Sequence, residues 1–421
     1  MAGRAFDESA ATPRPPFAFQ LEGRWGLVGP GLLRRRGVGA QRREGVGEGV
    51  HRAKRSEHPA AVHPYDRRQC SRGGWLRAGE GLRPPPGGCP GPPAPSLGGY
   101  PSTTCPEPLP TRPFSALRCP PPGSTIAVVA PAGPASEEHT RAVPALLAER
   151  GYVARLYPSC EVRAAGPFGH LAGPDAARLA DLHAAIADET NAAVWCLRGG
   201  YGSGRLLQAI DTGLIRRHPK PLIGYSDITA LHALWFREGL LALHAPMPAS
   251  DLVRPGRQAD ADAVFAWLQQ GLRAGTVLAP ERAADAPRHA GVAGVARGRL
   301  VGGNLSLIAA GCGTPWQLDT RGAVLFIEDV SESAYRVDRL LLQLRQAGLL
   351  DAAAGFLLGS FTEDDDPREV VGAELLPLRK PVLGGWPAGH GAPNRPLPMG
   401  AMVTLDAAAG TLTIEQDVLL P

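Results

Sequence analysis

The sequence predicts an α/β protein whose parallel β-sheet is covered by helices on both faces. Apolar segments of strand length alternate with helical segments of about 10 to 15 residues, the pattern of strand–helix–strand units. Several strand segments end in glycine-rich turns, and parallel sheets bind ligands at the carboxyl ends of their strands. The chain has 421 residues, 44% of them apolar, which is enough to build two or three domains.

The elements of the first half follow one another from Ser124. The segment "STIAVVAPAG" is a strand that ends in a Pro/Gly turn, and Ser136 can cap a helix that runs to Arg150. Further strands are expected in "YVARLY", "NAAVWCLRGG" and "PKPLIGYS", and further helices at 174–187, Ser203–Ile210 and Ile228–Arg237. Together these elements predict an N-terminal domain over residues 123–250.

Residues 251–291 are expected to form a connector with one helix at about 259–272. A second domain, 292–421, then begins with a strand, a turn and a helix in "GVARGRLVGGNLSLIAAG". It continues with the strand "GAVLFIED" and the amphipathic helix "AYRVDRLLLQLRQAG", which Gly348 ends. Short strands in "AGFLLGSF" and "KPVLGG" and a hairpin in "GAMVTLDAAAGTLTIE" complete it.

Residues 1–122 are dense in Pro, Gly and Arg and are predicted to be a disordered leader. Residues 1–120 hold 18 Arg and Lys against 9 Asp and Glu, whereas the rest holds 26 against 31. The leader can be a basic arm for nucleic acid or anionic lipid, a disordered tail, or translated upstream sequence with the real start near residue 120. The remainder carries no sign of a nucleic-acid partner.

The cysteines and the hydropathy indicate a cytoplasmic protein. Seven cysteines form no CxxC pair, which suits a reducing compartment, and Cys196 is expected to be buried in a strand. The sequence contains no run of 18 apolar residues, so no membrane span is expected. The N-terminus lacks the apolar core of a secretory signal. His232 and His244 lack the spacing of a metal site, so no metal is expected.

Ser226, in "PLIGYSDITALHALWF", lies at the tip of a predicted strand just before a helix. Several hydrolases present a nucleophile on such a turn. A base is available in His390, between glycines in "GGWPAGHGAPN", and an orienting acid in Glu328, at the end of the strand "LFIED". Each residue also has a structural interpretation: Ser226 as a helix cap, His390 as a loop histidine and Glu328 as a strand-end charge.

The loop "GGYGSG" can be a phosphate cradle, an oxyanion loop or a tight turn. It is not a Walker A loop, because no GK[ST] follows, and "IGYSDI" has Ile228 where a complete G-x-S-x-G elbow has glycine. Periodicity and spacing alone therefore predict a two-domain α/β protein that is a possible hydrolase.

Seven motifs taken in order resemble the LD-carboxypeptidase family, serine peptidases that include muramoyltetrapeptide carboxypeptidase. The resemblance covers roughly residues 124–417. The motifs are "AVVAPAGPAS", "HLAGPDAARLADLHAAIAD", "VWCLRGGYGSGRLL", "KPLIGYSDITALH", "GRLVGGNLSLIAAGCGTPW", "LFIEDVSESAYRVDRLLLQL" and "GHGAPNRPLPMG". One departure is Ala245, in "HAPM", where the family commonly has glycine.

The resemblance implies a flavodoxin-like N-terminal domain and a smaller mixed α/β C-terminal domain. It also implies catalysis by Ser226, Glu328 and His390 without a cofactor. The substrate implied is the tetrapeptide of peptidoglycan fragments, cleaved between the L-centre of a diamino acid and D-alanine during recycling in the cytoplasm, and many members are homodimers. For the oxyanion we expect the backbone N–H groups of Asp227 and Gly200, and for the substrate carboxylate Arg198 and Arg395.

Three other functions are considered. A self-immunity peptidase of the same family cleaves acyl-nucleotide toxins, and aromatic residues in the substrate loop would favour it, but the connector offers only Trp267. A non-catalytic binding module could keep the fold, although the intact Ser, Glu and His argue against this. A nucleotide-binding protein could use "GGYGSG", but no ribose-binding acid follows at the usual spacing.

Overall fold

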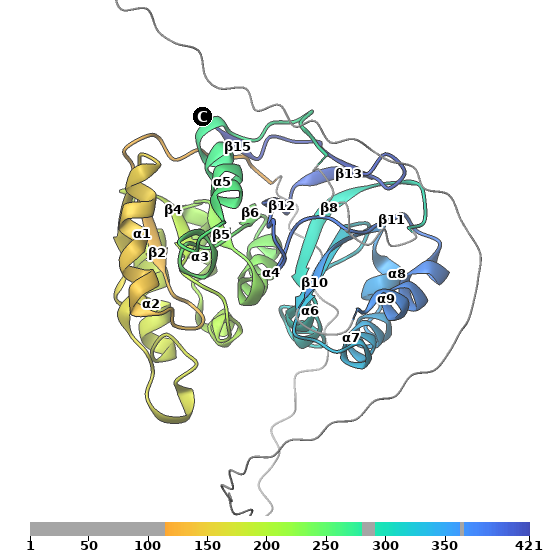
Figure 1. Ribbon diagram of the computed structural model, residues 1–421, viewed down its shortest axis with the longest axis horizontal. Coiled ribbons are helices and arrows are strands. Elements are labelled where there is room, and N and C mark those ends of the chain that lie inside the picture. Colours follow the sequence, from red (N-terminus) through yellow and green to blue (C-terminus); the bar gives the residue numbers. More distant parts are fainter. Residues whose placement is uncertain (1–113, 280–290, 363–365) are drawn as a thin grey trace, which may run out of the picture. The chain divides into compact units, whose positions relative to one another are not determined.

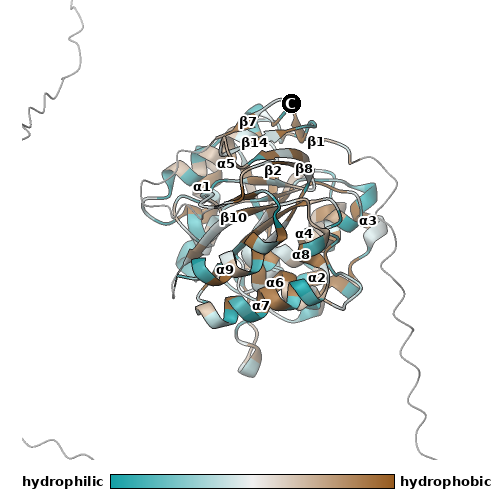
Figure 2. Ribbon diagram, turned by 90° about the vertical axis from the view of Figure 1, so that its right-hand side faces the viewer, coloured by the Kyte–Doolittle hydropathy of each residue, from teal (hydrophilic) through white to brown (hydrophobic). Residues whose placement is uncertain are grey.

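Two β-sheets organise the protein, whose computed structural model describes residues 114–279, 291–362 and 366–421 (Figure 1). All of these residues belong to one compact unit of the chain. In Figure 2 the hydrophobic colour is concentrated on the strands, whereas helices such as α7 also carry hydrophilic turns. No helix in the described ranges is long and apolar enough to cross a membrane.

The first sheet has six strands in the order β12-β6-β5-β4-β2-β3. All neighbours are parallel except β12, which runs antiparallel to β6. The five parallel strands have the order that flavodoxin-like sheets share, with the second and first strands followed by the third, fourth and fifth. The predicted fold class is confirmed. The strands are β2 (Thr125–Val129), β3 (Val153–Leu156), β4 (Asn191–Cys196), β5 (Leu222–Gly224), β6 (Ala242–His244) and β12 (Leu397–Met399).

Helices pack around this first sheet as the periodicity predicts. Ser136 caps α1, because its side chain accepts a hydrogen bond from the His139 N–H at 3.2 Å. The segment Ser203–Ile210, predicted as one helix, forms two 3₁₀ turns instead, since a segment this short that contains Gly204 has little helix propensity of its own. The helices are α1 (Glu137–Glu149), α2 (Asp175–Ala187), α3 (Thr212–Arg217), α4 (Thr229–Arg237) and α5 (Gln258–Gln270).

The second sheet has seven strands in the order β11-β10-β9-β8-β13-β14-β7. The strands from β11 to β8 are parallel, and the last three pair antiparallel. The strands are β7 (Val277–Leu278), β8 (Val295–Asn304), β9 (Val324–Val330), β10 (Gly355–Thr362), β11 (Val382–Leu383), β13 (Met402–Asp406) and β14 (Thr411–Ile414). The helices are α6 (Leu305–Gly311), α7 (Ala334–Gln346), α8 (Leu349–Ala352) and α9 (Arg368–Leu375).

Two boundaries differ from the sequence prediction. The leader was expected to extend to residue 122, but β1 (Leu117–Arg118) pairs with β15 (Leu419–Leu420), and Phe114 and Leu117 are buried. In addition, β12 lies within residues 292–421, predicted as the C-terminal domain, yet it extends the first sheet. Segments of two or three residues are too short to show a hydropathy period. They form these strands by pairing with segments that are far away in the sequence. Residues 1–113 of the predicted leader lie outside the described residues.

Candidate active site

Ser226 lies two residues after the end of β5 and begins a 3₁₀ turn, Ser226–Ile228, that leads into α4. Its backbone φ is +64°, in the left-handed region. A residue other than glycine in this conformation costs on the order of 1–3 kcal/mol, and such strain is concentrated at functional sites. The side chain is partly exposed, as a nucleophile on a strand-to-helix turn has to be.

Two glycines make room for this turn. A Cβ on Gly199 would lie 2.8 Å from the Ser226 Cβ and 3.0 Å from its Oγ. A Cβ on Gly224 would lie 3.0 Å from the Ile228 Cγ1 and 3.2 Å from the Cys196 Cβ. The backbone of the "RGGYGSG" loop therefore runs directly beside the Ser226 side chain.

We expect Gly199→Ala to lower kcat for amide hydrolysis by about 100-fold, because a displacement of about 1 Å at a nucleophile has an effect of that size. The matched control is Gly204→Ala in the same loop, where an added Cβ would meet only the Ala230 Cβ at 3.9 Å. Steady-state kinetics and thermal unfolding of both variants test the expectation. Equal kcat values in the two variants would show that the close approach of Gly199 to Ser226 is unimportant.

His390 lies in the loop that connects β11 of the second sheet to β12 of the first, and its side chain faces Ser226. Its Nε2 is 3.0 Å from the Ser226 Oγ, and its Nδ1 is 2.7 Å from the Glu328 Oε2. The backbone N–H of His390 also donates to the Glu328 Oε2 at 3.3 Å. The three side chains predicted from sequence thus lie in one hydrogen-bonded series, which permits His390 to take a proton from Ser226.

Glu328 is completely buried at the carboxyl end of β9. Backbone closes around its carboxylate: a Cβ on Gly389 would lie 2.5 Å from the Glu328 Oε2, and one on Gly359 would lie 3.0 Å from the Glu328 Cβ. Gly389, with φ +106°, is therefore the reason that His390 can approach the acid.

The pKa values of this pair shift in opposite directions. Burial by itself would lower the pKa of His390, but the Glu328 charge outweighs it and raises the pKa above the ordinary imidazole value. Burial by itself would raise the pKa of Glu328, but the charge of His390 holds it well below its ordinary value. The Glu328 carboxylate therefore favours the protonated form of the His390 imidazole.

Asp227 connects the turn to the glycine-rich loop. Its buried carboxylate accepts a hydrogen bond from the Ser203 N–H at 2.8 Å, and the Ser203 Oγ donates to the Asp227 carbonyl at 2.6 Å. Gly200 adopts φ +106° in that loop and packs against Gly133. Backbone from both segments thus borders Ser226.

The two arginines predicted to bind a substrate carboxylate donate hydrogen bonds to backbone carbonyls. Arg198 is exposed, and its Nη1 donates to the Pro134 carbonyl at 2.6 Å. The Nη1 of Arg395 donates to the Ala259 carbonyl at 2.9 Å. Sequence reasoning missed Arg257, whose Nη1 lies 3.3 Å from the carbonyl of Gly391, next to His390. It was assigned to the connector, where no local pattern distinguishes it.

Tyr225 and Asp251 were also missed. The Tyr225 ring lies 4.9 Å from the His390 ring, and its hydroxyl donates to the Asp251 Oδ1 at 2.9 Å. Asp251 is buried and also accepts from the Met247 N–H at 2.9 Å. The signal was available in the "GYSD" motif itself, where a tyrosine precedes the serine. Ala245 is buried, and it is not among the described residues with positive φ, so alanine fits at this position.

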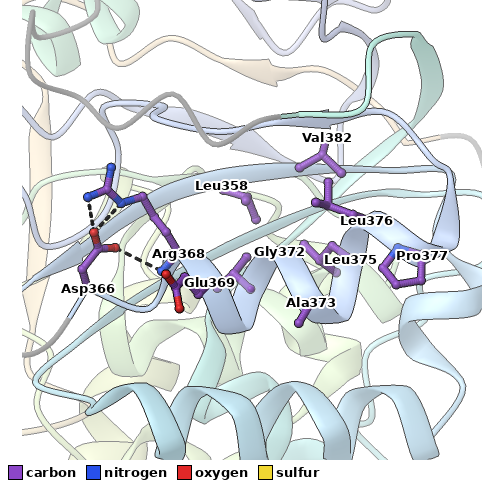
Figure 3. A pocket seen from close by; sticks show the side chains of 11 residues that line it. Leu358, Asp366, Arg368, Glu369, Gly372, Ala373, Leu375, Leu376, Pro377 and Val382 are labelled. Atoms are coloured by element: carbon purple, nitrogen blue, oxygen red, sulfur yellow. Dashed lines mark hydrogen bonds and ion pairs between the residues drawn. The ribbon is translucent and has the colours of Figure 1, made fainter.

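A surface pocket over α9 and β10 is separate from these residues (Figure 3). Leu358, Val371, Leu375 and Val382 form its apolar lining, and Arg368 and Asp366 are bonded to each other at its rim. Across the described ranges, no cluster of His, Cys, Asp and Glu is arranged to hold a metal ion.

A serine, a histidine and a carboxylate in hydrogen-bonding contact on this fold define a serine hydrolase. The sequence matches the LD-carboxypeptidase N-terminal domain over residues 126–245 and the LD-carboxypeptidase C-terminal domain over residues 297–405. The chain belongs to the LD-carboxypeptidase family and is a serine-type carboxypeptidase.

Known proteins agree with this assignment. The chain is 36% identical over 313 residues to a probable murein peptide carboxypeptidase from Bacillus subtilis, covering 70% of this chain and 93% of that one. It resembles the crystal structure of muramoyltetrapeptide carboxypeptidase from Oxalobacter formigenes with a TM-score of 0.62 and 29% identity, covering 70% and 100%. The microcin C7 self-immunity protein MccF, in complex with aspartyl sulfamoyl adenosine, shares the fold at 23% identity, with a TM-score of 0.65 and coverage of 73% and 100%.

Proposed function

We propose that this enzyme removes the terminal D-alanine from murein tetrapeptides by hydrolysing its amide bond to the L-centre of a diamino acid. The observation that carries the proposal is the hydrogen-bonded series from Ser226 through His390 to Glu328, at 3.0 and 2.7 Å. It is supported by the names of two relatives, a murein peptide carboxypeptidase and a muramoyltetrapeptide carboxypeptidase.

In this mechanism Ser226 attacks the amide carbonyl while His390 takes its proton at Nε2. Glu328 accepts the Nδ1–H hydrogen bond and stabilises the imidazolium. His390 then gives its proton to the nitrogen of the departing D-alanine. Water, activated by the same imidazole, hydrolyses the acyl-enzyme and restores the Ser226 hydroxyl.

Backbone N–H groups of Asp227 and Gly200 are proposed to bind the oxyanion, since both segments border Ser226. The carboxylate of the D-alanine needs a cation, for which Arg198, Arg395 and now Arg257 are the candidates. Arg257 is favoured among them because it lies beside the His390 loop: its Nη1 is 3.3 Å from the Gly391 carbonyl, and it is paired with the Asp260 Oδ2 at 2.9 Å.

We further propose that the enzyme acts in the cytoplasm on recycled muropeptides, as a homodimer with domains at 123–250 and 292–421. The four cysteines of the described residues are all free, which suits a reducing compartment. Analytical ultracentrifugation of the purified protein would test the homodimer directly.

The activity is tested by incubating purified protein with UDP-MurNAc-tetrapeptide and measuring free D-alanine by mass spectrometry. We expect D-alanine release from the tetrapeptide and none from the tripeptide product. A folded protein that releases no D-alanine would overturn the tetrapeptide assignment.

The same assay should include an aminoacyl sulfamoyl nucleotide, because the self-immunity protein shares the fold. Hydrolysis of this compound alone would identify a self-immunity peptidase, and tight binding of either compound without turnover would identify a binding module. Trp267, the aromatic residue weighed for base stacking, is partly buried against the core on α5, which does not favour the nucleotide substrate.

A further inference from the structure

Behind the acid lies a histidine that the mechanism above does not use. His244 ends β6, in the interior of the first sheet, where its backbone is in register with Gly224 of β5 and Leu397 of β12. Its side chain is completely buried, and neither ring nitrogen has a hydrogen-bond partner among the described residues. A buried imidazole without a partner costs about 1–3 kcal/mol, so its position calls for a physical reason.

The Glu328 carboxylate also has an oxygen atom that can accept a further hydrogen bond. The Oε2 of Glu328 faces His390, but its Oε1 has no hydrogen-bond partner in the described part of the chain. The Nε2 of His244 lies 4.0 Å from this Oε1. Because Gly359 and Gly389 close on the carboxylate, it has little room to turn toward other partners.

Aromatic rings surround the His244 imidazole. The Phe326 ring meets the His244 ring edge-on at 5.0 Å, and the Tyr225 ring lies 5.5 Å away. His232 of α4 lies behind it at 6.3 Å, and burial lowers the pKa of His232 to about 3, so that ring is neutral. The titratable groups that face His244 are thus Tyr225, His232 and Glu328.

We infer that His244 is a positioning residue whose Nε2–H donates to the Oε1 of Glu328 and thereby fixes the carboxylate that orients His390. A shift of about 1 Å in either side chain brings the two atoms to hydrogen-bond distance. One carboxylate oxygen then binds the His390 Nδ1–H and the other binds His244, so the acid cannot rotate away during proton transfer. This inference rests on the proposed roles of Glu328 and His390.

The test compares substitutions that keep or remove the donor. We expect His244→Phe, which keeps the ring volume, to lower kcat by about 10- to 100-fold with KM unchanged, as for other partners that orient a functional side chain. His244→Gln places an amide donor near the Nε2 position and should restore most of the activity. The matched control is His232→Phe, another buried histidine, which should keep nearly wild-type kcat.

Two measurements do not need the tetrapeptide, so they separate this inference from the proposed substrate. One is the downfield proton resonance of the His390 Nδ1–H, and the other is the rate at which a fluorophosphonate labels Ser226. We expect His244→Phe to change both and His232→Phe to change neither. If folded His244→Phe is labelled at the wild-type rate, the inference is wrong and His244 serves only in packing. The same conclusion follows if the labelling rate falls equally in His244→Phe and His232→Phe.

If His244→Phe does not fold, His244→Gln and His244→Asn decide the question, because the shorter asparagine cannot reach the acid. Slower labelling of the asparagine variant than of the glutamine variant supports the inference, and equal rates overturn it.

Discussion

Replacing Ser226 with alanine is expected to lower kcat for D-alanine release by about 10⁴-fold or more, the loss typical of a removed nucleophile. The substitution removes the hydroxyl that lies 3.0 Å from the His390 Nε2, so the covalent route is lost. Single-turnover kinetics with the tetrapeptide measure the effect. A variant that retains more than about one hundredth of the wild-type kcat would contradict the role of Ser226.

The left-handed backbone at Ser226 supplies a control that separates chemistry from folding. Ser226→Gly also lacks the nucleophile, but glycine adopts φ +64° without strain. We therefore expect the glycine variant to be equally inactive and to have a free energy of unfolding about 1 kcal/mol higher than the alanine variant. Denaturant unfolding of the two proteins measures this difference. Equal stabilities would mean that the turn is not strained.

Glu328→Gln is expected to lower kcat by about 10⁴-fold, as when an amide replaces the acid of comparable sites. The amide can donate to the Nδ1 of His390, which places the imidazole proton on Nε2. His390 then cannot accept the proton of Ser226. Steady-state kinetics measure the loss, and thermal unfolding checks that the buried glutamine is accommodated. A variant with kcat within tenfold of the wild type would show that Glu328 is not the orienting acid.

The same variant has a distinct pH dependence. In the wild type, Glu328 raises the pKa of His390, so kcat/KM should increase with pH and reach half its maximum above pH 6.5. Without the carboxylate charge, burial dominates and lowers the pKa of His390, so the acidic limb should move to lower pH. The control is Asp329→Asn, a neighbouring acid that binds Asn304 rather than His390. Equal shifts in both variants would indicate general electrostatics rather than the direct contact.

The sequence predicted most of the regular elements because each has a local signal. The strands β2, β4 and β9 each contain a run of at least four apolar residues, α1 has a serine cap, and these predictions are confirmed. The strands β1, β6, β7, β12 and β15 were not foreseen, because these segments of two or three residues form strands by pairing with other segments of the chain. The predicted helix at Ser203–Ile210 was wrong: the segment forms two 3₁₀ turns, because it is short and contains Gly204.

By itself, the sequence determined the fold class and the family, through seven motifs in order, and it offered Ser226, Glu328 and His390 as candidates. That these side chains meet depends on the tertiary structure, because Ser226 follows β5 of the first sheet, Glu328 lies in β9 of the second sheet, and His390 lies in the loop between β11 and β12. The tertiary structure also decided which buried groups surround them, since the 4.0 Å between His244 and Glu328 depends on the packing of both sheets. Local propensity and periodicity describe a chain's own neighbours, whereas a catalytic distance is set by long-range packing.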